Sequence, residues 1–174
     1  SALAGQIADK FEKSKLTRLI KLLEIGIMII AAVGFVFEWY ALLFVALFLM
    51  GTQSTFFGPI KYAYLPQAMR KNELVGANGL FQMGTSLAIL LGMIIAGVLT
   101  QITQPLFWIS VTVLFVAAIG YFAARFIPTM SAMQPDLKIN WNIFTTSMAT
   151  VRYLYSLPFL FFVILGNSWF WFYG

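Results

Sequence analysis

Between Glu73 and Arg125 the sequence contains no charged residue. A helix needs about 20 mostly apolar residues to cross the roughly 30 Å hydrocarbon core of a bilayer, so this stretch is too long for a single crossing. The segment QITQP (101–105) interrupts it with residues that favour a turn. Backbone polar groups must pair internally in a bilayer, and these residues do not alternate as barrel strands do, so two membrane-spanning helices joined by a tight turn are predicted.

The same criteria predict further spans on either side of this stretch. We expect the spans at about residues 18–37, 39–60, 78–100 and 106–124, with another beginning near Leu157. The composition agrees, because 61% of the residues are hydrophobic and 10% are charged, whereas about a quarter of the residues in a soluble domain are charged. The predicted fold class is therefore all-α, a polytopic membrane helix bundle.

The basic residues are grouped in segments that the predicted spans place on one side of the membrane. These residues are Lys10, Lys13, Lys15, Arg18, Lys21, Lys61, Arg70, Lys71, Arg125, Lys138 and Arg152. Lys and Arg concentrate in cytoplasmic loops, so we expect the Lys10 side to face the cytoplasm. Nothing in the sequence resembles a nucleic-acid-binding module, and the net charge of +5 indicates contact with anionic lipid headgroups rather than with nucleic acid.

Cysteine and histidine are absent from the sequence. Disulfides, thiol nucleophiles, Ser-His-Asp triads and His-ligated metal sites are therefore excluded from the chain. We expect no catalytic residue, no metal site and no cofactor. Glu24 and Glu38 lie near the ends of predicted spans, so no carboxylate is expected at mid-membrane; a proton-coupled pump would need other helices to supply one.

Residues 128–156 are too polar to span a membrane, yet they contain a helical pattern. Apolar residues recur at spacings of three and four: Trp141, Phe144, Met148, Val151 and Tyr155. Asn140 could cap the start of this helix. The pattern suits a helix on the cytoplasmic face of the membrane, or equally an amphipathic connector packed on its own protein.

Five polar side chains in the predicted spans are candidates for lining a headgroup path: Gln53, Lys61, Asn78, Gln82 and Asn167. Gly58-Pro59 should loosen the end of its helix just before Lys61, because proline removes a backbone donor. Lys61 would then either hold an anionic headgroup or extend to the membrane interface. Asn78 and Gln82 share a face with Thr85, which predicts either a cavity wall or hydrogen bonds between helices.

Two spacing patterns predict helix contacts. Lys21 and Glu24 lie one turn apart and can form an ion pair. Gly26 and Gly34 lie eight residues apart, as do Gly84 and Gly92, so each pair offers a smooth seam for close helix packing.

The segment 5–18 resembles the loop between the second and third helices of the major facilitator superfamily, whose pattern is Gly-x-x-x-Asp-Arg/Lys-x-Gly-Arg/Lys-Arg/Lys. The positions that match are Gly5, Asp9, Lys10 and Lys13. Glu12 replaces the second glycine, and Ser14 occupies a basic position. The resemblance implies that the matching residues belong to a cytoplasmic gating latch.

Three longer stretches are similar to the bacterial lysophospholipid transporter branch of that superfamily. They are GTQSTFFGPIKYAYLPQ (51–67), NELVGANGLFQMGTSLAILLG (72–92) and GNSWFWFYG (166–174). The resemblance implies that the spans are about helices three to seven of a twelve-helix transporter, and that the chain is an internal fragment. Residues 1–127 would belong to the N-terminal six-helix half, 128–156 to a cytoplasmic connector, and 157–174 to the start of the C-terminal half.

The resemblance implies that lysophospholipids, chiefly lysophosphatidylethanolamine, move across the bacterial inner membrane by alternating access and are re-acylated inside. The implied partners are membrane lipids, the lysophospholipid substrate, the remaining helices of the parent chain and, in some bacteria, a fused acyltransferase and acyl-carrier-protein ligase. The alternatives are a drug or metabolite transporter, the membrane part of a phospholipid-repair fusion enzyme, or a scaffold. A chain without histidine cannot contain the acyltransferase motif His-x4-Asp, so we expect no enzyme in this chain.

Overall fold

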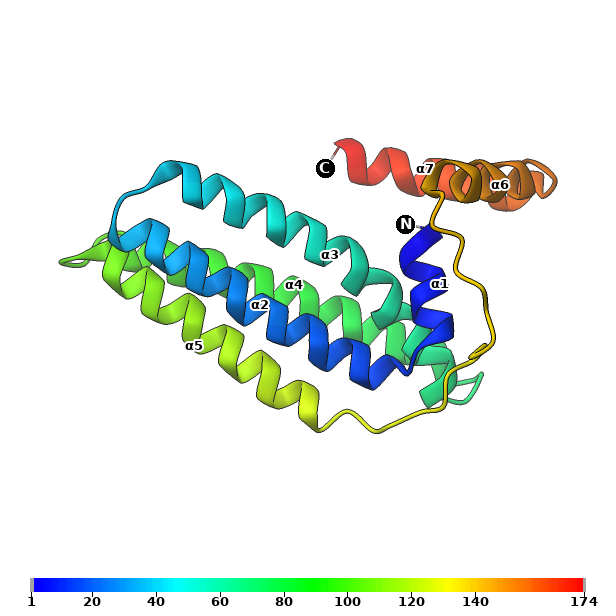
Figure 1. Cartoon of the computed structure of the whole chain (residues 1–174), viewed down its shortest axis with the longest axis horizontal. Helices are drawn as coiled ribbons and strands as arrows, with labels where there is room; N and C mark the ends of the chain where they lie inside the picture. Colours follow the sequence, from blue (N-terminus) through cyan, green and yellow to red (C-terminus); the bar gives the residue numbers. More distant parts are fainter. Residues whose placement is uncertain (1, 174) are drawn as a thin grey trace.

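The computed structural model describes residues 2–173, which fold into helices without any strand (Figure 1). The helices are α1 (Ala2–Lys10), α2 (Lys13–Val36), α3 (Tyr40–Ala68), α4 (Leu74–Leu99), α5 (Pro105–Arg125), α6 (Ile143–Tyr155) and α7 (Pro158–Tyr173). In this described part, the four helices α2 to α5 are long and apolar enough to cross a membrane. The predicted all-α helix bundle is confirmed.

Helix α2 lies between α3 and α5 and packs against both, and α4 completes the bundle by contacting α3 and α5. The interior is made of small and branched residues: Ile27, Ala31 and Ala46 form one buried cluster at the α2–α3 seam. All of α4 is described, and none of its residues is buried. Its apolar surface needs a cover of lipid or further helices, because so much exposed apolar area is unfavourable in water.

Helix α3 is longer than its sequence predicts. It continues through Pro59 and Pro66 to Ala68, so the expected break before Lys61 is wrong. Ile60 and Leu65, which lie between the two prolines, are fully buried, and α3 packs here against α1. This packing offsets the backbone hydrogen bonds that the prolines remove, because neighbouring groups hold a proline-containing helix together in membrane proteins.

The two turns at the far end of the bundle use left-handed residues. Glu38 has a φ of 52° and Gln104 a φ of 57°. The amide of Trp39 donates to the carbonyl of Gly34 at 2.9 Å, which closes α2 in a helix-ending turn. Pro105 follows Gln104 at the first position of α5, where its fixed φ suits a helix start. The predicted tight turn at 101–105 is confirmed.

Of the four glycines in the two predicted packing seams, Gly34 alone makes a close helix contact. A Cβ added there would lie 2.7 Å from Leu43 Cδ2 and 3.4 Å from the Leu43 amide nitrogen. At Gly26, Gly84 and Gly92 an added Cβ would meet nothing within 4 Å. The α2–α3 contact is therefore tight at Gly34, and the other three positions face open space.

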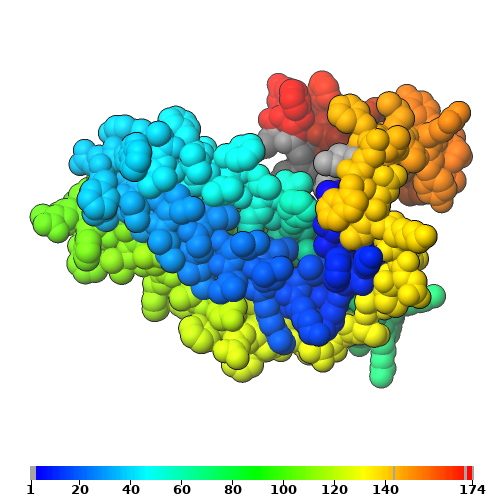
Figure 2. Space-filling model, in the orientation of Figure 1, coloured from blue at the N-terminus to red at the C-terminus, as the bar shows by residue number. Residues whose placement is uncertain are grey.

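At the opposite end, the segment between α5 and α6 runs back along α1. The amide of Gln134 donates to the carbonyl of Asp9 at 2.9 Å, and the amide of Asn140 donates to Gln6 Oε1 at 2.8 Å. Arg18 donates to the carbonyl of Ile127 at 3.2 Å. Figure 2 shows this segment, in yellow, lying against the blue atoms of α1.

Helix α6 confirms the helix predicted within residues 128–156 but not its predicted cap. The side chain of Asn142 caps α6 by accepting from the Thr145 amide at 3.2 Å. Asn140 instead accepts from the amide of Asn142 at 3.0 Å, a local Asx turn that moves the helix start two residues along. The described chain leaves the apolar face of α6 open, and Phe144 is 87% exposed.

Candidate functional site

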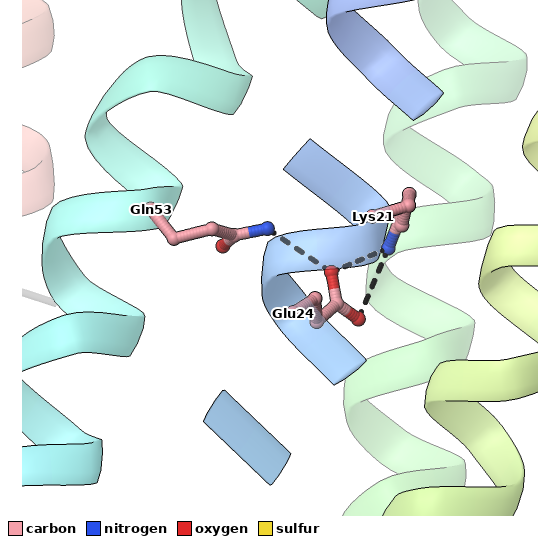
Figure 3. A network of polar contacts seen from close by, with 3 residues as sticks. All are labelled: Lys21, Glu24 and Gln53. Atoms are coloured by element: carbon pink, nitrogen blue, oxygen red, sulfur yellow. Dashed lines mark hydrogen bonds and ion pairs between the residues drawn. The ribbon is translucent and has the colours of Figure 1, made fainter. Parts of the chain in front are cut away.

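A three-residue polar network joins α2 to α3 in the middle of the bundle (Figure 3). Lys21 Nζ lies 2.8 Å from Glu24 Oε2 and 3.1 Å from Oε1, which confirms the predicted pair. Gln53 Nε2, from α3, donates to Glu24 Oε2 at 3.0 Å. The side chains of Lys21 and Glu24 are each 21% exposed, so the pair is largely removed from the surface.

Glu24 lies further from the start of its helix than its sequence predicts. Helix α2 begins at Lys13 and has 24 residues, so Glu24 lies halfway along it. The basic residues before Arg18 suggest a solvated loop, whereas the side chain of Lys13 is only 1% exposed and opens the helix. The expectation that no carboxylate lies at mid-membrane stays a prediction.

Helix α5 contributes a surface to the network rather than a charge. A Cβ added at Gly120 would lie 3.5 Å from Lys21 Nζ, at van der Waals contact, so the lysine side chain lies against α5 at this glycine. The same Nζ lies 5.2 Å from the ring centroid of Phe57, where the ring face attracts a cation. Burying an ionisable pair in a helix of this kind costs free energy, and such residues are rare unless they have a function. This marks the network as a candidate site.

Glu24 also lines a cleft between α2, α3 and α4 with a volume of about 1010 Å³. Its polar lining includes Ser54, Lys61 and Thr85. Lys61 Nζ donates to Thr85 Oγ1 at 3.0 Å and lies 5.3 Å from the ring centroid of Phe81. Lys61 thus points across to α4 from within a helix instead of lying beyond a helix end.

The structure groups some of the predicted path residues and separates others. Lys61 lines the cleft, and Gln53 reaches Glu24 at its edge. Asn78 and Gln82 are exposed on α4, and Asn167 is exposed on α7; none of the three is among the described residues that line this cleft. Glu24 was not among the predicted path residues. The signal that could have indicated it is its position three residues after Lys21, within an otherwise apolar helix.

The latch residues lie at the junction of α1 and α2. Gly5, Asp9 and Lys10 belong to α1, so this part of the predicted loop is helical, and Lys13 opens α2. Lys13 Nζ is buried without a hydrogen-bond partner in the described part of the chain, and the carboxylate of Asp9 attracts it. The role of this group in gating stays a prediction.

Glu12, where the family pattern has glycine, makes local contacts at this junction. Its carboxylate accepts a hydrogen bond from the Ser14 hydroxyl at 2.6 Å and lies 3.2 Å from Lys15 Nζ. These two contacts, the Ser14 bond first, lower the pKa of Glu12 below its ordinary value of 4.5. The residue is therefore charged at neutral pH and starts α2 as an anion near the helix N-terminus.

Comparison with known proteins adds independent information. The family model of the Major Facilitator Superfamily matches residues 1–174. The lysophospholipid transporter LplT of Enterobacter sp. (strain 638) is 30% identical over 172 residues, covering 96% of this chain and 40% of that protein. LplT of Escherichia coli O1:K1 / APEC is 28% identical over 174 residues, with the same coverage of 96% and 40%. The chain thus spans about 40% of the length of these relatives. No solved structure matches it significantly.

Proposed function

The chain belongs to the Major Facilitator Superfamily of multi-pass membrane transporters, and from this premise we propose that it is part of a lysophospholipid transporter. The cargo we propose is chiefly lysophosphatidylethanolamine, moved across the bacterial inner membrane by alternating access. Relatives named as lysophospholipid transporters support the cargo. Transport rather than catalysis is the activity of this chain, and re-acylation falls to a separate or fused acyltransferase.

The observation that carries the proposal is the cleft between α2, α3 and α4. A lysophospholipid has one charged end and one apolar chain, so its site needs charged groups beside an apolar wall. Lys61 and Thr85 supply an ammonium and a hydroxyl, and the wall is formed by residues such as Met50, Leu80 and Ile89. Charge-assisted hydrogen bonds from a lysine are a usual way to hold a phosphate.

We place the parts of the chain in the membrane accordingly. Residues 1–127 form part of the N-terminal half, 128–156 form the cytoplasmic connector, and 157–174 begin the C-terminal half. The Lys10 side faces the cytoplasm. The latch residues Gly5, Asp9, Lys10 and Lys13 gate that side.

The proposal is tested by transport in a purified system. The intact protein is reconstituted in vesicles, and the uptake of labelled lysophosphatidylethanolamine is followed over time. We expect faster uptake than in protein-free vesicles of the same lipid. Equal rates in the two preparations would overturn the proposal.

A further inference from the structure

Helix α6 has an apolar face that the described chain leaves uncovered. Among the described elements, α6 contacts α1 and α7 alone. The side chains of the face recur three or four residues apart along the helix and its first flanking turn. They are between 44% and 87% exposed: Trp141, Phe144, Met148, Val151 and Tyr155. So much contiguous apolar surface requires a cover other than water.

The bend between α6 and α7 sets the direction of α6 relative to the membrane. Helix α7 contains no charged residue, and Phe159 and Phe162 on it are 80% and 68% exposed. In a multi-pass membrane protein, a helix of this composition enters the hydrocarbon core. The two helices are bent by 118° at the break between them. A bend this close to a right angle directs α6 along the membrane surface rather than through it.

The apolar face of α6 is turned toward the side on which α7 lies. Tyr155, at the end of that face, has its ring centroid 4.5 Å from that of Phe161 in α7. In Figure 1, α6 lies at the α1 end of the bundle, and α7 runs from it back toward the other end. The face therefore points in the direction of the hydrocarbon that α7 enters.

The residues around the face suit the boundary between headgroups and hydrocarbon. Trp141 and Tyr155, at its two ends, are of the aromatic types enriched at membrane interfaces. Arg152 lies one turn after Met148 and is exposed, so its long side chain can extend from the apolar face to a phosphate. Lys138 precedes the helix, and α6 itself contains no Asp or Glu. The charge of this segment is therefore positive, as in helices that bind anionic membrane surfaces.

We propose that α6 is a membrane-surface helix, which lies in the headgroup region at the α1 end of the bundle with its apolar face in contact with lipid. The partner of this face is a lipid surface rather than a further protein segment. The proposal goes beyond transport, because it requires only that the chain lies in a membrane. It can therefore fail or hold whatever the transported molecule is.

Nitroxide labels measure what touches each side of α6. The chain contains no cysteine, so Met148→Cys and Thr150→Cys each introduce one labelling site in it, and any cysteine elsewhere in the intact protein is first replaced. Thr150 is the matched control, because a position two residues after Met148 lies on the opposite side of the helix. Collisions of each label are measured with oxygen, which concentrates in lipid, and with a water-soluble nickel chelate, in vesicles that contain phosphatidylglycerol.

We expect the ratio of oxygen to nickel collisions to be about threefold or more higher at Met148 than at Thr150, because the apolar face of a surface helix lies about 5–10 Å inside the headgroup boundary. A Met148 label shielded from both reagents would show that protein covers the face. Equal ratios at the two positions would show that water reaches both. Either result would overturn the proposal.

A second experiment tests whether the apolar face holds the helix at the surface. Phe144→Glu combined with Val151→Glu should lower the oxygen-to-nickel ratio of the Met148 label by about threefold, since carboxylates are unfavourable in hydrocarbon. Thr146→Glu combined with Tyr153→Glu is the matched control, with the same added charge and the same spacing on the other side of the helix, and it should leave the ratio within about 1.5-fold. An equal change in the two double variants would contradict the proposal.

Discussion

Lys61 reaches from α3 to α4 inside the cleft, where its Nζ donates to Thr85 at 3.0 Å. We predict that Lys61→Ala slows the uptake of labelled lysophosphatidylethanolamine by about tenfold or more, because charge-assisted hydrogen bonds to the phosphate are lost. Initial uptake rates in vesicles, normalised to the amount of inserted protein, measure the effect.

The matched control for this prediction is Lys71→Ala. Lys71 is exposed in the turn between α3 and α4 and does not line the cleft, so its loss should leave uptake within about twofold. If Lys61→Ala transports as well as this control does, Lys61 only extends toward the membrane interface and the phosphate role is wrong.

In the Lys21–Glu24–Gln53 network, the contact within one helix could be predicted from the sequence and the contact between helices could not. The Lys21–Glu24 pair was predictable, since residues three apart share a helix face. Gln53 is distant in the chain from Glu24, and only the packing of α3 on α2 brings the two together. The start of α2 was mispredicted because burial of Lys13 extends the helix into a segment that is rich in charge.

Among the elements, the long apolar helices were predictable and their ends were not. An apolar run of sufficient length leaves the backbone no alternative to a helix in lipid. Helices α2 to α5 therefore follow from the positions and lengths of the apolar runs. The end of α3 depends instead on whether tertiary contacts compensate Pro59 and Pro66, and the contact of α3 with α1 does so. Asn140 and Asn142 illustrate the same limit at the start of α6, where either residue has a side chain able to cap.

The α2–α3 seam gives a prediction about stability. Gly34→Val places a side chain 2.7 Å from Leu43 Cδ2 and close to the Leu43 backbone. We expect it to lower the free energy of unfolding by about 1–3 kcal/mol, the usual cost of overpacking a tight contact. Thermal unfolding of the purified protein in detergent measures this loss.

Gly26→Val is the control in the same helix, because an added Cβ there meets nothing within 4 Å. It should leave the unfolding temperature nearly unchanged. Leu43→Ala introduced beside Gly34→Val should recover part of the loss, since the two residues are in contact and their effects are not additive. Equal destabilisation by the two valine substitutions would show that the close approach at Gly34 is not the cause.

At the scale of the whole molecule, the turns that join the apolar helices lie alternately at the two ends of the bundle, and the basic turns share one end. The turns at Glu38 and Gln104 lie at one end of the bundle, and α1 with the connector lies at the other (Figure 1). The basic residues Arg70, Lys71 and Arg125 lie in or beside the turns at the second end. Helices α2 to α5 therefore cross in alternating directions, as the order of charges along the sequence predicts.

This arrangement predicts the orientation of the protein in the membrane. The turn at 101–105 is uncharged, whereas the α3–α4 turn carries Arg70 and Lys71, and basic loops are retained in the cytoplasm. Alkaline phosphatase, which is active only outside the cytoplasm, should be active when fused after Gln104 and inactive when fused after Lys71. The pair of fusions forms its own control, because α4 (Leu74–Leu99) is the only helix that separates the two points among the described elements. Activity at Lys71 with none at Gln104 would reverse the orientation, and it would also place the Lys10 latch on the outer side, where it could not gate the cytoplasmic opening.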